Sequence, residues 1–216
     1  MPLRGWPLSL PVRASMSKWT TLPRAFYRRD PRLVAPDLLN KLIVRDDGRA
    51  GRIVEVEAYC GADDPAAHSY RGQTARNATM FGPAGHLYVY FTYGMHWCAN
   101  AVCGKVGEGV GVLLRAMEPI EGLELMREAR PQAKRDRDLG SGPARLAQAL
   151  GVTRKFDGAD LVKNDQGIRI VTDGTPPPDG PISGPRIGIS VGIEHPWRWH
   201  VPGQVHVSRF RRTPSP

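Results

Sequence analysis

A chain of 216 residues suffices for one domain with a full hydrophobic core and is too short for two ordinary domains. Its formal net charge of +9 favours a polyanionic partner, either a nucleic acid or an anionic membrane surface. The three cysteines form no C-x-x-C pair, which argues against a disulfide framework and a zinc ribbon. No apolar run approaches the roughly 20 residues that span a bilayer, so we expect no membrane-spanning segment. Of the two polyanions we expect a nucleic acid, and not a membrane, as the partner.

The first residues of the chain differ in composition from the rest. Residues 1–18 contain a short apolar run that prolines interrupt, which makes a poor signal peptide. We expect these residues to be a disordered extension, residues 19–212 to be the folded domain, and residues 213–216 to be a C-terminal tail.

The first part of the domain favours short helices and a β-hairpin. Helix-start signals with proline predict a short helix through residues 38–39. Residues 41–45 and 52–59 favour strands, and Gly48 supplies the positive φ of the turn between them. Residues 63–68 predict a capped turn of helix.

Aromatic residues dominate the next hairpin. Residues 87–93 and 97–102 favour extended structure, and Gly94 separates them, so Tyr93 and Met95 should lie at the hairpin tip. Large apolar side chains gain nothing from water, and an exposed tip of this kind suggests insertion into a partner. In a basic protein that partner can be a stack of bases.

Strands and helices follow one another irregularly in the second half. Proline and glycine residues mark their expected ends. We expect a strand at 111–117 ended by Glu118-Pro119, a helix over 120–130, a helix capped by Ser141 and running to Leu150, a strand at 167–171, and closing strands at 186–191 and 204–209. Strands dominate and βαβ alternation is rare. The pattern predicts an α+β domain with a curved, largely antiparallel sheet, surrounding helices and a protruding β-hairpin.

Two carboxylates stand on one face of the strand at residues 52–59. Glu55 and Glu57 are two residues apart, so their side chains point the same way. Their repulsion raises at least one pKa where water is excluded, which would prepare a general acid or base. The alternative is a solvated polar face. Arg115 lies in an otherwise apolar strand and needs an anionic partner, either Glu57 or a phosphate.

Structural roles compete with catalytic ones at these positions. Tyr90 could be a core aromatic, His68 could cap a turn, and Arg115 could close an ordinary salt bridge. No G-x-S-x-G elbow, helix-opening G-x-G-x-x-G motif or P-loop occurs, which disfavours serine hydrolases and nucleotide-binding enzymes. Two alternatives stay open: a sugar glycosidase with Glu55 and Glu57 as its acid/base pair, and a non-catalytic nucleic-acid-binding protein.

Several motifs occur together in a characteristic order and spacing, from about Asp30 to Arg209. They are Gly51–Tyr59, Ala66–Ser69, Arg76-Asn77, Leu87–Tyr90 with Tyr93-Gly94-Met95, Asn100, Leu113–Ala116 and Ser141-Gly142-Pro143. This set resembles the signature of the alkyladenine (3-methyladenine) DNA glycosylase family. The resemblance implies hydrolysis of the N-glycosidic bond of alkylated or deaminated purines in double-stranded DNA. Its expected substrates are 3-methyladenine, 7-methylguanine, hypoxanthine and ethenoadenine, and its product is an abasic site.

The same resemblance implies the site residues. Glu57 would be the general base that activates a water, and Arg115 would help to hold that water and the local phosphate. Replacing Glu55 by glutamine should then have only a mild effect on base release. The remaining implied roles are base binding for Tyr59, His68, Tyr90 and Asn100, intercalation for Tyr93 and Met95, and phosphate contact for Arg71, Thr74 and Arg76.

The implied chemistry requires no metal and no cofactor. No lysine stands in the motifs, so a Schiff-base nucleophile with strand cleavage is not expected, and the enzyme should be monofunctional. We expect a monomer in the cytoplasm, associated with the nucleoid, or in the nucleus if the source is eukaryotic.

Overall fold

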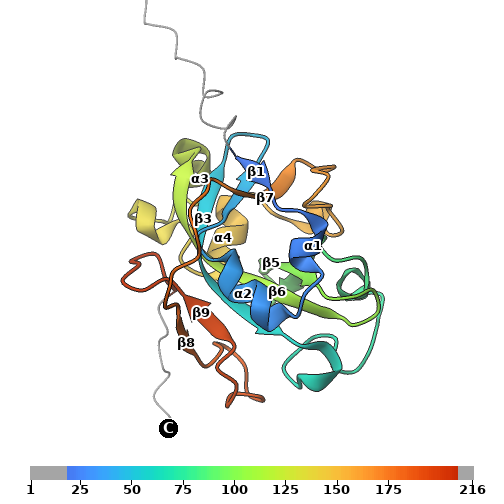
Figure 1. The fold of residues 1–216 in the computed structure, drawn as a ribbon. Coiled ribbons are helices and arrows are strands. Elements are labelled where there is room, and N and C mark those ends of the chain that lie inside the picture. Colours follow the sequence, from blue (N-terminus) through green and yellow to red (C-terminus); the bar gives the residue numbers. More distant parts are fainter. Residues whose placement is uncertain (1–18, 209–216) are drawn as a thin grey trace, which may run out of the picture.

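A curled β-sheet organises residues 19–208, which are the part of the chain that the computed structural model describes (Figure 1). The expected extension at 1–18 and the expected tail at 213–216 lie outside the described residues. Every strand pairing is antiparallel, and the main path of the sheet has the order β1-β7-β2-β3-β6-β5-β4. The expectation of an α+β fold with a curved antiparallel sheet is confirmed.

The elements follow the expected sequence with some shifted bounds. The strands are β1 (Thr20–Thr21), β2 (Leu42–Arg45), β3 (Ala50–Tyr59), β4 (Leu87–Thr92), β5 (His96–Cys103), β6 (Val110–Glu121), β7 (Ile168–Thr172), β8 (Ile182–Gly184) and β9 (Arg198–His200). The α-helices are α1 (Arg24–Tyr27), α2 (Pro31–Leu38), α3 (Leu123–Ala129) and α4 (Pro143–Ala149). Short 3₁₀ turns are η3 (Gly61–Asp63), η4 (Ala78–Phe81), η5 (Asp136–Asp138) and η6 (Arg154–Phe156).

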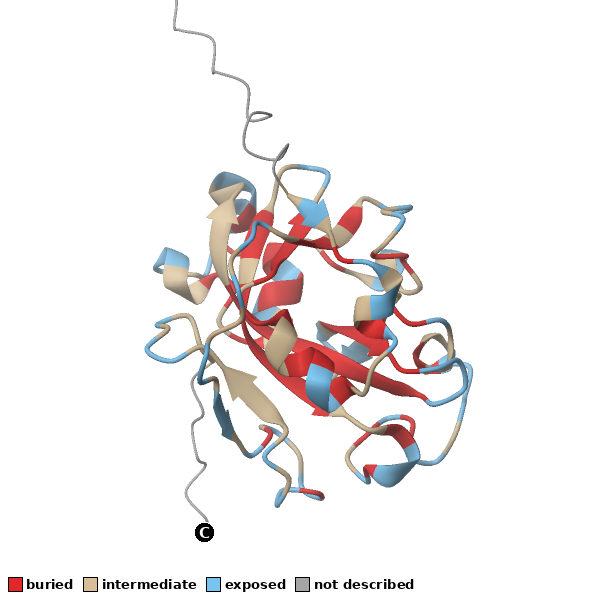
Figure 2. Ribbon diagram, viewed as in Figure 1, coloured by how far each residue is buried: buried red, intermediate tan, exposed pale blue. Residues whose placement is uncertain are grey.

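The long strands β3 and β6 form the centre of the sheet and are buried along most of their length (Figure 2). Helices α1, α2 and α4 contribute to the same core cluster, which includes Val34 and Leu38 from α2, Leu146 from α4 and Leu114 from β6. Among residues 19–208, no helix combines the length and the apolar character that crossing a membrane demands.

An irregularity in the β3–β6 pairing decides where the carboxylates point. The register shifts on both sides of Glu55. Ile53 and Val56 belong to the same core cluster although they are three residues apart, so the core-facing positions change parity between them. Bulges of this kind re-aim side chains and are common beside functional sites. Here the change leaves Glu55 and Glu57 on the face away from that core.

Strand β6 is longer than expected. The expectation that Glu118-Pro119 ends it is wrong, because the strand continues to Glu121 and α3 starts only at Leu123. Pro119 pairs with Gly51 at a third register shift, and a proline without an N–H is tolerated at such an irregularity.

Three further local expectations are also wrong. Residues 64–71 form turns after η3, so His68 ends no helix. Gly142, with φ 136°, is the N-cap of α4, since Ser141 pairs in extended conformation with Ala116. The closing strands are β8 and β9. Residues 186–191 form no strand, residues 204–208 form turns, and residue 209 lies outside the described part.

Candidate active site

The carboxylate of Glu57 is fully buried and held by three donors. Its Oε1 atom lies 3.1 Å from Nη1 of Arg115 and accepts the N–H of Ile187 at 2.7 Å. Its Oε2 atom accepts the hydroxyl of Tyr59 at 3.0 Å. Each oxygen of a carboxylate accepts about two hydrogen bonds, so Oε2 keeps room for one more donor, such as a water.

Glu55 forms the second half of this network. It is fully buried, and its Oε1 accepts from Nε of Arg115 at 3.0 Å, Nε of Arg198 at 2.7 Å and the hydroxyl of Ser208 at 2.8 Å. Its Oε2 accepts the backbone N–H of Ser208 at 2.6 Å. The interpretation of a solvated polar face is therefore wrong, and Arg115 has its anionic partners in both carboxylates.

The environment shifts the pKa values of the two carboxylates in opposite directions. Burial raises the pKa of Glu57 above its ordinary value, although Arg115 and the hydrogen bonds oppose this. Burial would also raise the pKa of Glu55, but Arg115 and Arg198 outweigh it and hold the pKa of Glu55 below its ordinary value. Arg115 is itself buried, and the two glutamates keep its pKa high, so it stays charged.

A cavity of about 220 Å³ opens beside this network. Glu57 lies beneath its wall, and the wall includes its three donors, Arg115, Ile187 and Tyr59. The other side chains around the cavity are mostly aromatic or apolar. They include His68, Met80, Tyr88, Tyr90, Tyr93, Cys98, Asn100 and Leu113. The expected catalytic and base-binding residues thus meet at one site.

His68 and Tyr90 contact each other at the cavity. Their ring centroids are 4.4 Å apart and nearly perpendicular, and Tyr88 stacks on Tyr90 at 5.5 Å. Burial, followed by the charge of Arg76, lowers the pKa of His68, so its imidazole is neutral at neutral pH. A neutral ring beside aromatic faces can accept either a neutral or a cationic planar ligand.

Asn100 is buried at the cavity wall and donates weakly, through Nδ2, to the carbonyl of Tyr88 at 3.4 Å. It lies opposite Leu113 in the pairing of β5 with β6. An amide in this position presents both a donor and an acceptor to a bound base.

The hairpin tip extends into solvent. Tyr93 is 78% exposed and Met95 is 67% exposed. Tyr93 and Gly94 have φ of 51° and 66°, and the N–H of Met95 donates to the carbonyl of Thr92, as in a type I′ turn. Tyrosine rarely adopts a positive φ, and such backbone outliers are more frequent at functional sites than elsewhere.

The expected phosphate contacts lie on one exposed loop between His68 and η4. Arg71, Thr74 and Arg76 are all exposed. The buried side chain of Asn77 shapes the loop: its Nδ2 donates to the carbonyls of His68 and Gly72, and its Oδ1 accepts the N–H of Thr74. Within residues 19–208, no carboxylate forms an ion pair with Arg71 or Arg76.

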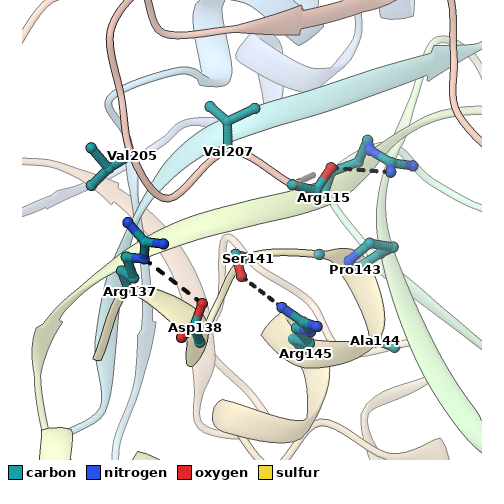
Figure 3. A pocket seen from close by; sticks show the side chains of 11 residues that line it. Arg115, Arg137, Asp138, Ser141, Pro143, Ala144, Arg145, Val205 and Val207 are labelled. Carbon is teal, nitrogen blue, oxygen red and sulfur yellow. Dashed lines mark hydrogen bonds and ion pairs between the residues drawn. The ribbon is translucent and has the colours of Figure 1, made fainter. Parts of the chain in front are cut away.

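A second groove, of about 630 Å³, shares Arg115 and Pro143 with the cavity of about 220 Å³ (Figure 3). Arg137 and Arg145 both line it, and Ser141 accepts a hydrogen bond from Arg145. Arg154 lines a further hollow together with Arg76 and Tyr93. Cationic side chains therefore line two hollows that each share residues with the cavity.

Sequence reasoning missed several groups at the site. Ile187 acts through its backbone, and Arg198 and Ser208 come from a part of the chain with misplaced strands, so no side-chain pattern indicated them. Arg145 and Arg154 are exposed arginines among many. No group of three or more His, Cys, Asp or Glu side chains in the described part of the chain could hold a metal ion.

Comparisons with known proteins give a consistent result. Residues 25–205 match the family model for methylpurine-DNA glycosylase. The chain is 65% identical over 187 residues to a Burkholderia lata protein, covering 87% of this chain and 90% of the relative. It is 50% identical over 206 residues to a protein of Streptomyces avermitilis, covering 90% of this chain and 97% of the relative. It is 48% identical over 198 residues to a protein of Methanoculleus marisnigri, covering 88% of this chain and 99% of the relative. Each relative bears the name "Putative 3-methyladenine DNA glycosylase".

Proposed function

The chain belongs to the methylpurine-DNA glycosylase family and is a DNA glycosylase, and from this premise we propose how it works. It extrudes a damaged purine from double-stranded DNA into the aromatic cavity, where a water activated by Glu57 hydrolyses the N-glycosidic bond. The proposed substrates are 3-methyladenine, 7-methylguanine, hypoxanthine and ethenoadenine. The first agrees with the names of the relatives.

One observation carries this proposal. A desolvated carboxylate with a raised pKa lies directly behind an aromatic cavity, and its orientation is fixed by Arg115, Tyr59 and the Ile187 amide. Buried, perturbed carboxylates at a cavity are typical of acid–base catalysts. A structural salt bridge alone would not need the surrounding aromatic wall.

In the proposed step, the water oxygen forms a bond to C1′ of the sugar while the bond from C1′ to the base nitrogen breaks. The bonding electrons leave with the base, and the proton of the water passes to Glu57. Positive charge develops on the sugar, as in other glycoside hydrolyses, and the carboxylate stabilises it. Arg115 stays charged and holds the water and the neighbouring phosphate. The product is an abasic site with an unbroken strand.

Tyr59, His68 and Tyr90 are proposed to stack against the extruded base, and Asn100 to crowd the exocyclic amino group of guanine. Alkylation at a ring nitrogen makes a purine cationic, and aromatic faces attract such a cation. The neutral His68 adds no opposing charge.

The duplex is proposed to lie across the hairpin tip, with Tyr93 and Met95 in the space that the extruded nucleotide leaves. Extrusion costs a few kcal/mol, which the inserted side chains offset. Arg71, Thr74 and Arg76 would contact phosphates on one side. The groove with Arg137 and Arg145, beside Arg115, would hold the backbone on the other. Such contacts give steep salt dependence.

The deciding experiment uses a duplex with a single hypoxanthine or ethenoadenine. Abasic-site formation without strand cleavage supports the proposal. Binding without base release would instead favour a non-catalytic nucleic-acid-binding protein. Release of sugars from an oligosaccharide, without affinity for DNA, would favour a sugar glycosidase.

A further inference from the structure

Arg186 and Asp64 form a buried ion pair behind the aromatic cavity. Both side chains are fully buried, with Nη1 to Oδ2 at 2.5 Å and Nη2 to Oδ1 at 2.8 Å. The same carboxylate accepts the backbone N–H groups of Cys60 and Ala66, each at 3.1 Å. Neither member of the pair lines the cavity, so the pair acts on it through its neighbours.

The guanidinium of Arg186 joins segments that are far apart in the sequence. It donates to the carbonyl of Ala58 at 3.1 Å, near the end of β3, and to that of Gly192 at 3.3 Å. Its Cζ atom lies 4.7 Å from the ring centroid of Tyr59 and 5.1 Å from that of Trp197. The guanidinium therefore supports a ring that forms part of the cavity wall.

The residue that follows Arg186 completes the connection to the reacting groups. Ile187 donates its N–H to Oε1 of Glu57 at 2.7 Å. Because Ile187 follows Arg186 directly, the contacts that hold Arg186 in place also hold the Ile187 amide in place. A buried ion pair contributes little net stability compared with apolar residues of the same volume. The planar fork of arginine is useful where several acceptors must be held in one geometry.

We propose that Arg186 and Asp64 are positioning residues for base excision: they hold the Ile187 amide on Glu57 and the Tyr59 ring at the cavity wall. This inference rests on the proposed function. The pair touches no reacting atom. Its loss should slow the chemical step, since a displacement of about 1 Å at a catalytic group can cost about 100-fold in rate.

The first test replaces Arg186 by lysine, which keeps the charge but cannot span both carboxylate oxygens and two carbonyls. We expect Arg186→Lys to lower the single-turnover rate on a hypoxanthine duplex by about 10- to 100-fold at saturating enzyme. Its affinity for duplex with an abasic site should match wild type. Arg24→Lys is the matched control. Arg24 forms an ion pair with the buried Asp160, with 2.6 Å between Nη2 and Oδ2, and neither residue lines the cavity. This control variant should melt at a lower temperature and excise at the normal rate.

A second variant guards against misfolding. The double change Arg186→Met with Asp64→Leu removes both charges together, so no unpaired charge stays buried. It should fold cooperatively and still excise slowly. A normal rate in this folded variant would overturn the proposal.

The pH profile separates positioning from a merely structural role. The charged or titratable groups that interact with Glu57 are Glu55, Tyr59, Tyr90, Cys98, Arg115 and Arg186. From β9, Arg198 lies opposite Glu57 in the strand pairing and donates to Glu55. The Ile187 N–H lowers the pKa of Glu57, so a displaced amide should move the acid limb of the rate profile to higher pH.

The outcomes are distinguishable. If the wild-type enzyme excises no damaged base, both the proposed function and this inference are wrong. If the wild-type enzyme excises damaged bases and Arg186→Lys has the same rate and the same acid limb of the pH profile, this inference is wrong and the proposed function stands.

Discussion

The carboxylates of Glu55 and Glu57 leave the same face of β3 and have pKa values that depart from the ordinary glutamate value in opposite directions. Arg115 contacts both, through Nε to Glu55 and Nη1 to Glu57. Arg198 and Ser208 add donors to Glu55 alone. Glu55 is therefore the anion that holds Arg115 in place, and Glu57 is the more readily protonated of the two carboxylates.

Glu57→Gln should abolish nearly all base release while preserving DNA affinity. The amide cannot accept a proton from water, and general base catalysis is typically worth about 10²- to 10⁴-fold. Single-turnover excision and binding to a hypoxanthine duplex measure the two properties. A near-normal rate would remove Glu57 from its proposed role.

The single-turnover rate should fall with decreasing pH through a pKa above the usual glutamate value of 4.5. Burial favours the protonated carboxyl of Glu57, and that form cannot take a proton from water. A rate profile on ethenoadenine, from about pH 4 to 8, locates this limb. A flat profile through this range would contradict the assignment.

Glu55→Gln should destabilise the fold by about 3–5 kcal/mol at neutral pH, because it leaves the buried Arg115 and Arg198 short of an anion. The pKa of Glu55 is lowered in the folded state, so its contribution is present above the unfolded pKa. The contribution is lost as pH falls through the folded pKa. Urea unfolding at neutral pH and near pH 3 measures the difference between the variants. An unchanged midpoint at neutral pH would contradict this structural role of Glu55.

Tyr93→Ala should lower excision of a paired lesion roughly tenfold or more, since base–aromatic stacking is worth about 1–3 kcal/mol. The loss should be smallest for a lesion in a bulge or a single strand, where little flipping is needed. Melting should hardly change, because the side chain is 78% exposed.

Tyr93→Asn is a matched control for this variant, because asparagine suits a positive φ and cannot replace the ring. It should melt no lower than wild type and excise as slowly as Tyr93→Ala. Equal losses on paired and bulged lesions would rule out the wedge.

Asn100→Ser should raise excision of normal guanine from a mismatch relative to hypoxanthine. The two bases differ by one exocyclic amino group, and the smaller side chain would make room for it beside Leu113. Comparing the two rates in the same duplex context tests the change. An unchanged ratio would mean that selectivity lies elsewhere in the cavity.

Sequence patterns anticipated the parts of the site that depend on side-chain type and strand parity. The alternation around Glu57 and the aromatic content of β4 indicated the strand and the hairpin tip, whereas the residues of the cavity wall were implied by the family resemblance. The burial of Glu55 could not be predicted, because its partners Arg198 and Ser208 are about 143 and 153 residues away. Backbone donors such as Ile187 leave no signature in a sequence.

The irregular pairing at Glu55 has a consequence for how this stretch can vary. A substitution between Ile53 and Val56 alters one side chain, whereas an insertion or deletion there reverses the facing of every later residue in the strand. Glu57 would then turn toward the core, and Val56 toward the cavity. Length is thus the constrained property of this segment, and engineering that transplants the site should keep this stretch of β3 whole, together with the part of β6 that contains Arg115.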